Sequence, residues 1–174
     1  MTVVNCPSCD FENIEGADEC EQCGQSLTAM PVTTSVVEKQ LFRDRIRDLS
    51  PRAPLVCTPD TPLSEVVKML FEHSVGAVTI VEGGEIVGIF SERDALMRLN
   101  NDYPQLLDKP VSEYMTPRPV TLEARDKIAY AMHKMDLGGY RHIPVTDEGQ
   151  LTGMISVRHI LRYITDTLLK ADSE

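Results

Sequence analysis

Apolar residues along most of the chain recur either at the spacing of a helix or at the spacing of a strand. Within residues 61–70 they return every three or four positions, which predicts an amphipathic helix. Two apolar runs follow at 75–81 and 86–90, and the acidic residues and glycines between them predict a β-hairpin. A short apolar strand at 55–57 precedes this set, and a second helix over 91–99 follows it. The predicted order of elements is therefore β-α-β-β-α.

The same order of elements recurs later in the chain. The segments Gly88–Asp94 and Gly153–His159 are variants of one pattern at an offset of 65 residues, and the apolar positions around them align at that offset without a gap. Two copies of one supersecondary unit follow. Each copy has a strand containing glycine and then a serine that can cap the next helix. Only the first copy has an aspartate, Asp94, three residues after that serine, where the second copy has His159.

Two such halves would bury both of their apolar faces by packing sheet to sheet. We therefore expect an α/β (α+β) fold with two repeats in a pseudo-symmetric pair and a small N-terminal appendage. Residues 36–49 are predicted to form an amphipathic helix with a solvated face over the repeats. The expected boundaries are 1–27 for the appendage, 28–45 for a linker and the amphipathic helix, 46–99 for the first repeat, 100–110 for an inter-repeat linker, 111–164 for the second repeat and 165–174 for a C-terminal tail.

The composition and charge of the chain argue against several classes of function. The 174 residues are 42% hydrophobic and 25% charged, as in a soluble globular protein. There is neither a run of about 20 apolar residues nor a signal-peptide pattern, so we expect a cytoplasmic protein without membrane contact. A net charge of −10 disfavours nucleic-acid surfaces, although a local cationic pocket remains compatible with it. We find no nucleophile with a recognisable base and no open metal site, and expect no enzyme activity.

Four of the five cysteines form two C-x-x-C pairs, Cys6 with Cys9 and Cys20 with Cys23. Four thiolates make a closed tetrahedral site, and a segment of about 30 residues needs a metal because it buries too little surface to fold alone. The prediction is structural zinc, with iron in a rubredoxin-like site or four unliganded thiols as the alternatives. Cys57 stands in an apolar run and is predicted to lie in the core.

The run from residue 5 to residue 27 resembles the short zinc-ribbon family. It departs from the family at Asp10, which replaces the glycine usual after the first cysteine pair, but aspartate tolerates the left-handed conformation. The ten residues between the pairs are enough for a short hairpin. Residues 1–38 contain acidic side chains but no Lys or Arg, so we expect a structural or protein-docking role rather than nucleic-acid binding.

The two repeats resemble a tandem pair of CBS (cystathionine-beta-synthase) domains, the arrangement called a Bateman module. The residues that carry the resemblance are Gly88–Leu96, Tyr140–Val145 and Gly153–Ser156, together with the gapless repeat. The resemblance implies a regulatory module that binds an adenine nucleotide (AMP, ADP or ATP), or S-adenosylmethionine, in a cleft between the repeats. It also implies a homodimer that associates through helical faces and acts on a protein partner whose identity the sequence leaves open.

The resemblance further assigns roles to residues of the first cleft. Asp94 would accept hydrogen bonds from the ribose hydroxyls, because a carboxylate can accept both protons of a vicinal diol. Ser91 would meet the ribose or a phosphate, and the backbone near Val56 and Thr58 would line the adenine. The segment Arg141-His142 from the opposite repeat would reach the phosphates, for which arginine offers a bidentate fork.

Alternatives for these residues remain open. Ser91 and Asp94 also fit a capping box that only starts a helix, and Arg141-His142 also fit a solvated loop. At the second cleft His159 replaces Asp94, and Gly76-Ala77 take the place of Arg141-His142. We therefore expect one competent nucleotide site. The rival functions are a CBS scaffold that dimerises without a ligand and an iron-binding redox protein.

Two further histidines, His73 and His133, lie at the polar edges of helical patterns, without an acidic or cysteine partner at ligand spacing. We expect both to lie on the surface.

Overall fold

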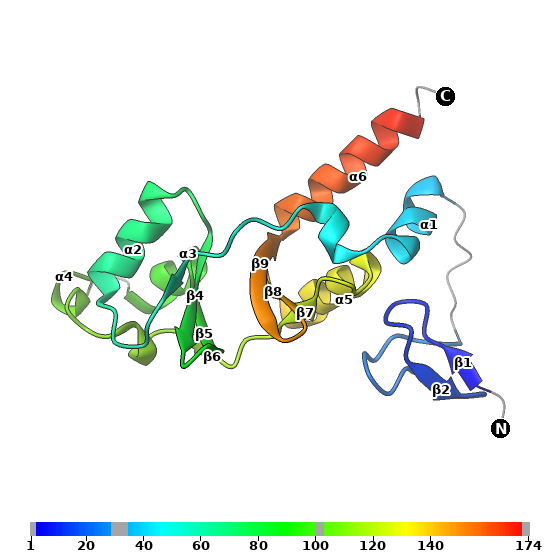
Figure 1. Ribbon diagram of the computed structural model, residues 1–174, viewed down its shortest axis with the longest axis horizontal. Helices are drawn as coiled ribbons and strands as arrows, with labels where there is room; N and C mark the ends of the chain where they lie inside the picture. The colour runs from blue at the N-terminus through cyan, green and yellow to red at the C-terminus, as the bar shows by residue number, and fades with distance from the viewer. Residues whose placement is uncertain (1–2, 29–34, 100–102, 172–174) are drawn as a thin grey trace. The chain divides into compact units, whose positions relative to one another are not determined.

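The computed structural model describes residues 3–28, 35–99 and 103–171. Parts of three predicted connections lie outside these residues, namely 29–34 of the first linker, 100–102 of the inter-repeat linker and 172–174 of the tail. The chain divides into two compact units (Figure 1). The first unit combines Met1–Pro51, Leu122–Arg141 and Ile155–Glu174, and the second combines Arg52–Thr121 and His142–Met154.

The second unit contains most of the first repeat, in the predicted order of elements. Its four-stranded sheet has the order β3-β4-β5-β6, in which β3 runs parallel to β4 and the other neighbours are antiparallel. The π-helix η2 directly follows α3, so the predicted helix over 91–99 is present with a widened second half. The bounds are β3 Val56–Cys57, α2 Leu63–Glu72, β4 Ala77–Glu82, β5 Glu85–Ser91, α3 Glu92–Asp94, η2 Ala95–Leu99, α4 Tyr103–Leu106, η4 Val111–Glu113 and β6 Thr116–Pro117.

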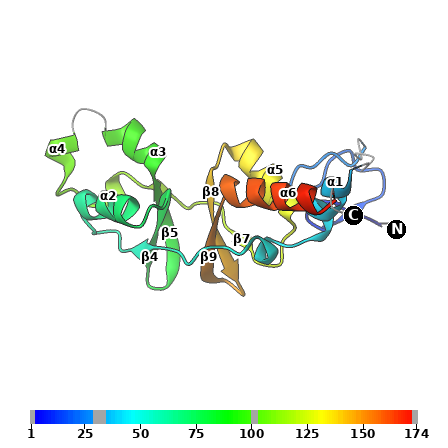
Figure 2. The same ribbon diagram turned by 90° about the horizontal axis from the view of Figure 1, so that it is seen from above.

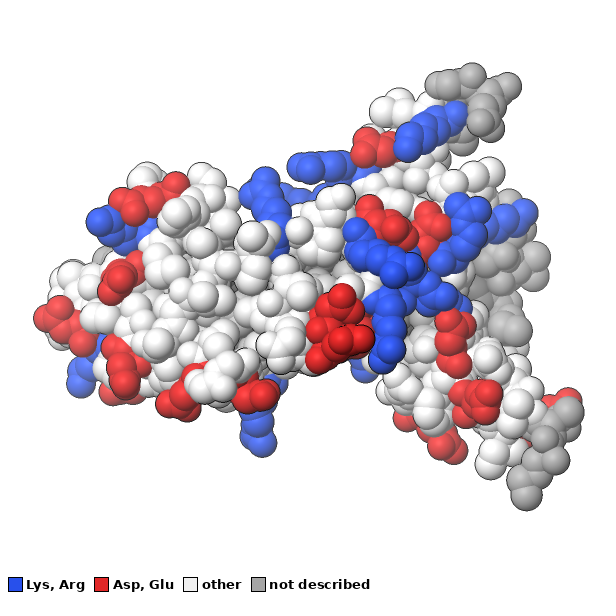
Figure 3. All heavy atoms as spheres, in the orientation of Figure 1, with Lys and Arg blue, Asp and Glu red and all other residues white. Residues whose placement is uncertain are grey.

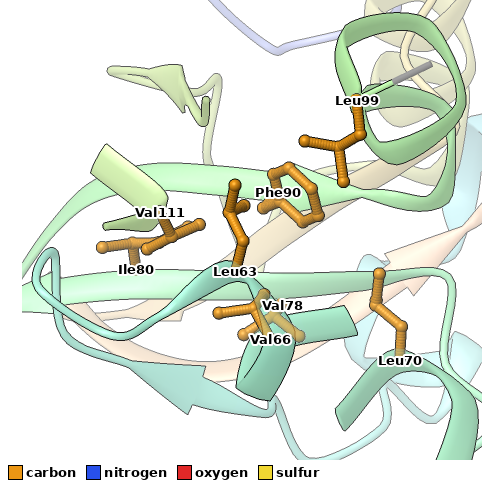
Figure 4. Close-up of a cluster of buried hydrophobic side chains, with 8 residues drawn as sticks. All are labelled: Leu63, Val66, Leu70, Val78, Ile80, Phe90, Leu99 and Val111. Atoms are coloured by element: carbon orange, nitrogen blue, oxygen red, sulfur yellow. The ribbon is translucent and has the colours of Figure 1, made fainter. Parts of the chain in front are cut away.

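The core of this unit lies between helix α2 and one face of the sheet (Figure 4). Alternate residues of β4 and β5 point into it, because successive strand side chains point to opposite faces. The apolar stripe of α2 covers them, as its spacing predicts. Cys57 packs against the same cluster, and burial raises the pKa of its thiol, so its predicted place in the core is confirmed. The cluster consists of Leu63, Val66, Leu70, Val78, Ile80, Phe90, Leu99 and Val111.

The predicted hairpin is present in both repeats and uses the same turn. Strands β4 and β5 are joined by Gly83 and Gly84, which have φ values of 59° and 91°. Strands β8 (His142–Asp147) and β9 (Gln150–Ser156) are joined by Glu148 and Gly149, with φ values of 50° and 80°. Two successive residues with positive φ match the twist of the flanking strands. The internal repeat therefore extends to the backbone conformation of the turn.

The second repeat contributes helices α5 (Ile128–Gly138) and α6 (Val157–Ala171) to the first unit. Strand β7 (Leu122–Glu123) joins β8 and β9 in a sheet of order β7-β8-β9. Helices α5 and α6 pack against each other and against α1 (Val36–Arg43), and the three lie together in both Figure 1 and Figure 2. The strands that flank the first cysteine pair, β1 (Val3–Asn5) and β2 (Glu12–Ile14), form a separate antiparallel pair.

The predicted single helix over 36–49 is wrong. Helix α1 ends at Arg43, and a 3-10 turn, η1 (Ile46–Leu49), follows two extended residues, Asp44 and Arg45. The break has a tertiary cause. The Ile46 N–H donates to the Asp126 carbonyl at 2.8 Å, and the Asp44 carbonyl accepts from the Ile128 N–H at 3.1 Å. These backbone hydrogen bonds outside the helix outweigh the local helical preference.

Candidate functional site

The four paired cysteines converge at one point in the first unit. Their Sγ atoms all lie within 4.8 Å of one another, and three of the four residues are buried. Cys6 and Cys23 have their Sγ atoms 3.6 Å apart, as do Cys9 and Cys20. A tetrahedron with metal–sulfur distances of about 2.3 Å has sulfur–sulfur edges of about 3.8 Å. The donor set and its spacing therefore fit a tetrahedral zinc ion.

The turns that carry the cysteines explain this convergence. The first pair sits at the tip of the β1–β2 hairpin, and the second lies in a turn closed by the bridge between Glu19 and Ser26. The predicted hairpin between the two pairs is therefore wrong, because strand pairing brackets the first pair instead. Asp10, directly after it, has a φ of 62°. Its predicted left-handed conformation is confirmed.

The thiols differ in how readily they ionise. Burial raises the pKa of Cys9 and raises that of Cys23 to about 11. Burial also opposes ionisation of Cys20, but hydrogen bonds from the backbone N–H groups of Cys23 and Gln22 outweigh it and lower its pKa to about 7. Four thiolates this close repel one another strongly without a cation. A divalent metal would supply that charge and displace the remaining thiol protons.

The cysteine-rich ribbon, residues 3–28, makes polar contacts with the helical part of the same unit. The Lys127 ammonium pairs with the Asp10 carboxylate and donates to the Pro7 carbonyl at 3.0 Å. Arg45 Nη1 lies 3.3 Å from the same carboxylate. Lys127 precedes helix α5, so both cationic partners come from outside the ribbon. Asp10, which departs from the glycine of the resembled family, is the residue that makes these ion pairs.

A histidine takes part in the same contact. His133 Nε2 lies 2.8 Å from the Cys23 carbonyl oxygen, and the residue is half-buried on α5. The prediction that His133 lies on the surface is wrong, because the residue is half-buried against the ribbon. His73 is exposed at the end of α2, as predicted. No sequence spacing links His133 to a cysteine 110 positions earlier.

The second candidate site lies at the junction of β5 and α3 in the second unit. Asp94 Oδ2 accepts from the Ser91 backbone N–H at 2.9 Å and from the Ser91 hydroxyl at 2.6 Å. The Asp94 N–H donates back to Ser91 Oγ at 3.3 Å. The capping box considered from the sequence is therefore present. Capping uses one carboxylate oxygen and leaves Oδ1 for other partners.

The second oxygen of Asp94 has partners that sequence reasoning did not identify. Thr116 Oγ1 donates to Asp94 Oδ1 at 3.2 Å, and Arg98 Nη2 lies 3.3 Å from it. The Asp94 side chain is 13% exposed, and that of Arg98 is 41% exposed. The spacing of Asp94 and Arg98 on one helical turn is a signal that could have suggested their pairing. Thr116 comes from β6, and no local pattern predicts its contact.

One face of the sheet extends from the β5 end beside Asp94 to β3, the strand predicted to line the adenine. Ala77 pairs with Ser91, Thr79 pairs with Ile89 and Thr79 also pairs with Val56. Paired residues of neighbouring strands point to the same face, so these side chains lie opposite the core cluster. Val56 stands at the edge strand with its side chain 49% exposed. Thr58 follows it, and its N–H donates to the Thr61 hydroxyl at 3.1 Å in an exposed turn.

Thr79 is buried beneath this face. The residue is 0% exposed, and its hydroxyl oxygen is the one buried side-chain N or O atom without a hydrogen-bond partner within residues 3–28, 35–99 and 103–171. A buried hydroxyl without a partner costs about 1–3 kcal/mol. This feature could not be predicted from the sequence, because Thr79 stands in an apolar run where a valine would fit equally well.

The two residues predicted to contact the phosphates belong to different units. His142 belongs to the second unit, where its ring occupies the space beside Gly76, since a Cβ on Gly76 would lie 2.3 Å from the ring. The Gly76 carbonyl accepts from the Glu92 N–H at 3.0 Å, which links this position to the start of α3. Arg141 is exposed in the first unit, and its carbonyl accepts from the Val157 N–H at 3.1 Å.

The second repeat shows what replaces Asp94. His159 Nδ1 accepts from the Ser156 N–H at 3.0 Å and lies 2.9 Å from the Ser156 hydroxyl. The imidazole therefore performs the capping that Asp94 performs in the first repeat. Helix formation does not require an acid at this position, and His159 offers no carboxylate to a diol.

On the face in Figure 3, several basic side chains gather in one cluster with acidic side chains beside it. None of the helices in the described parts of the chain combines the length and apolarity needed to cross a bilayer.

Comparison with protein families gives a match to the family described as CBS domain, over residues 46–101 and 111–166. A curated mitochondrial CBS domain-containing protein from Arabidopsis thaliana, CBSX3, is 31% identical over 115 residues. That alignment covers 63% of this chain and 56% of the plant protein. The chain thus spans about half the length of this relative, and 27% of the plant protein CBSCBSPB5, to which it is 28% identical.

Solved structures share the fold. A CBS-domain containing protein from Agrobacterium tumefaciens is 29% identical, with a TM-score of 0.64 over 69% of this chain and 98% of that one. The CBS domain pair of MJ0100 in complex with 5′-methylthioadenosine and S-adenosyl-L-methionine is 22% identical, with a TM-score of 0.63 over 71% and 97%. CBSX2 in complex with AMP is 23% identical, with a TM-score of 0.60 over 70% and 96%.

Proposed function

Because this chain belongs to the CBS-domain family, we propose that it is a regulatory module that binds an adenine nucleotide beside Asp94. The observation that carries the proposal is the largely buried Asp94 carboxylate at the end of a sheet face that also bears the exposed Val56. A carboxylate suits the vicinal diol of ribose, and an exposed apolar strand edge suits a purine ring. The AMP complex of CBSX2 and the S-adenosylmethionine complex of MJ0100 support an adenosine ligand.

The remaining predicted residues complete this proposal. Ser91 fixes the Asp94 carboxylate through two hydrogen bonds, so that its orientation is set before a ligand arrives. The Thr58 turn would lie against the adenine next to Val56, and the His142 ring would face a phosphate. Arg141 stays a proposed phosphate contact. The second repeat would lack a ribose site, because His159 uses its Nδ1 to cap a helix.

We further propose that the ribbon is a structural zinc module and that it serves as a protein-docking adaptor. Its four cysteines leave no open coordination position, which disfavours metal-centred catalysis. Its lack of Lys and Arg disfavours nucleic acid as the partner. A homodimer of the CBS pair, regulating a partner protein, is the assembly in which we expect it to act.

A thermal-shift series with AMP, ADP, ATP and S-adenosylmethionine tests the nucleotide site. A ligand at 100 times its dissociation constant adds about 2.7 kcal/mol of stability. We expect such a shift for the wild type and none for Asp94→Ala. The matched control is His159→Ala, which removes the equivalent helix cap in the second repeat and should keep the full shift.

This pair of variants separates binding from capping. Both substitutions remove an equivalent hydrogen-bonding side chain at a helix start, so both should lower stability without ligand by about 0.5–2 kcal/mol. A nucleotide shift that survives in Asp94→Ala would refute the proposed site. The absence of a shift with every ligand would favour a CBS scaffold that dimerises without a nucleotide.

A further inference from the structure

Both oxygens of the Asp94 carboxylate already have partners in this structure. A carboxylate offers about four lone-pair sites on two oxygens. Ser91 occupies two of them on Oδ2 through its N–H and its hydroxyl. Thr116 Oγ1 donates to Oδ1 at 3.2 Å, and Arg98 Nη2 forms an ion pair with the same oxygen at 3.3 Å. Three of the about four sites are therefore taken by hydrogen bonds, so a ribose diol that donates twice to Asp94 must displace a partner already present.

The partners on Oδ1 are the easier ones to displace. The Ser91 N–H, at the start of a helix, donates to Asp94 Oδ2, so losing Asp94 would remove this partner. Arg98 is 41% exposed, and a partly exposed ion pair contributes little stability. Thr116 also accepts from Arg98 Nη2 at 3.1 Å, so its hydroxyl keeps a partner when it leaves Asp94.

We propose that Arg98 and Thr116 are affinity-determining residues of the Asp94 site, which compete with the ribose diol for Asp94 Oδ1. The inference rests on the proposed function, because it assumes a nucleotide at Asp94. In this proposal the two side chains weaken nucleotide binding, so removing either of them frees an acceptor and increases the affinity. Neither residue contributes to the capping box, which Ser91 and Asp94 form alone.

Arg98 also has contacts that remain when it releases Asp94. Its Nη1 donates to the carbonyl oxygens of Tyr114 and Met115 at 2.8 and 2.7 Å. These carbonyls lie directly before β6, the strand that pairs with Gly88 and Ile89 of β5. Arg98 can therefore release Asp94 while its Nη1 keeps these two hydrogen bonds.

The second repeat has no equivalent of this competition. The position that corresponds to Arg98 at the repeat offset is Tyr163, whose hydroxyl donates to the Asp44 carboxylate. The acceptor on the adjacent turn is the His159 imidazole, whose Nδ1 accepts from Ser156. The arrangement of an acid, an arginine and a threonine thus belongs to the repeat that we propose binds the nucleotide.

Calorimetric titration of AMP into the full chain tests the inference. Arg98→Met should bind AMP about threefold to tenfold more tightly than the wild type, since it removes one exposed ion pair and the hydrogen bonds that accompany it. Thr116→Val, which keeps the side-chain shape, should bind about twofold to fivefold more tightly. It also provides the test if Arg98→Met fails to fold. Arg93→Met is the matched control, because Arg93 is exposed on the same turn and should leave the affinity unchanged.

A second ligand identifies the group in competition. The gain in Arg98→Met should be smaller for 2′-deoxy-AMP than for AMP, because a single hydroxyl needs fewer acceptor sites. Equal gains for the two ligands would overturn competition with the diol. Unchanged or weaker AMP binding in both Arg98→Met and Thr116→Val would overturn the inference and leave the proposed function standing.

The remaining outcomes separate the two ideas. If the wild type binds no AMP but Arg98→Met does, the competition is supported in its strongest form. If neither the wild type nor any of the variants binds AMP, ADP, ATP or S-adenosylmethionine, the proposed function fails, and the inference fails with it.

Discussion

Single residues at equivalent positions of the two repeats perform the same structural task with different chemistry. Asp94 and His159 both accept from the N–H of a serine three residues earlier. Capping therefore accounts for the presence of an acceptor, but it does not account for a carboxylate whose second oxygen contacts Arg98 and Thr116. That second oxygen is what distinguishes the repeats at the scale of one side chain.

Thr79→Val should stabilise the chain in the absence of nucleotide. The substitution replaces a fully buried hydroxyl that lacks a partner with a methyl group of similar size, and we expect a gain of about 1 kcal/mol. Chemical denaturation of the wild type and the variant measures this difference. The control is Thr152→Val, because the Thr152 hydroxyl donates to the Val145 carbonyl and its loss should not stabilise. A Thr79→Val variant less stable than the wild type would show that its hydroxyl is satisfied in solution.

At the scale of elements, the helices of the first unit are joined by a few polar contacts. The Tyr163 hydroxyl on α6 donates to the carboxylate of Asp44, the residue that ends α1. Burial and the nearby Asp44 raise the pKa of Tyr163 to about 12. For Asp44, burial opposes ionisation, but hydrogen bonds from Arg43 and Tyr163 outweigh it and lower the pKa.

The pKa shift of Tyr163 determines how the stabilising effect of its hydrogen bond to Asp44 changes with pH. Since the pKa of Tyr163 is raised from 10 to about 12 in the folded chain, its stabilising contribution is complete below pH 10 and is lost between pH 10 and 12. We expect Tyr163→Phe to be less stable than the wild type by about 1–2 kcal/mol at pH 8. The difference in melting temperature should shrink toward zero as the pH approaches 12. A difference that is constant with pH would rule out this hydrogen bond as its source.

The contact between the ribbon and helix α5 depends on Lys127. Its side chain is 12% exposed and pairs with Asp10, so Lys127→Met should weaken the docking of the ribbon without removing a metal ligand. Hydrogen exchange of ribbon amides should accelerate about fivefold to thirtyfold, from a loss of about 1–2 kcal/mol. Lys39→Met, on an exposed position of α1, is the control and should exchange like the wild type. Equal exchange in both variants would mean that Lys127 does not hold the ribbon.

Much of the fold at this scale could be predicted from the sequence, because periodicity and the internal repeat are local signals. The hairpins, helix α2 and the helix after Ser91 all follow from them. The break at Asp44 could not be predicted, since hydrogen bonds to Asp126 and Ile128 cause it. The same holds for His133 and Thr116, whose partners are distant in sequence. Spacing predicted that the four cysteines share one site, and the structure brings them together, whereas the ligand role of Asp94 stays a prediction.

At the scale of the whole molecule, the ribbon and the repeats depend on different sources of stability. The second unit buries a cluster of apolar side chains, whereas we propose that the ribbon relies on a metal for its fold. Cys20→Ser, or a strong chelator, should therefore unfold the ribbon and leave the repeats folded. Nuclear magnetic resonance spectra should lose the dispersed signals of residues 3–28 and retain those of the sheets.

Metal analysis completes that prediction. The wild type should retain about one zinc ion per chain after dialysis, as expected for a four-cysteine site, and Cys20→Ser should retain much less. Visible absorbance in the purified protein would instead indicate iron bound by thiolates. A Cys20→Ser variant that keeps a folded ribbon without metal would contradict a structural metal.

The central claim is that one of the two repeats provides a competent adenine-nucleotide site, and isothermal titration calorimetry with AMP tests it most directly. We predict one AMP per chain, with binding abolished by Asp94→Ala and preserved in His159→Ala. Two equal sites per chain, or binding that survives Asp94→Ala, would contradict the claim.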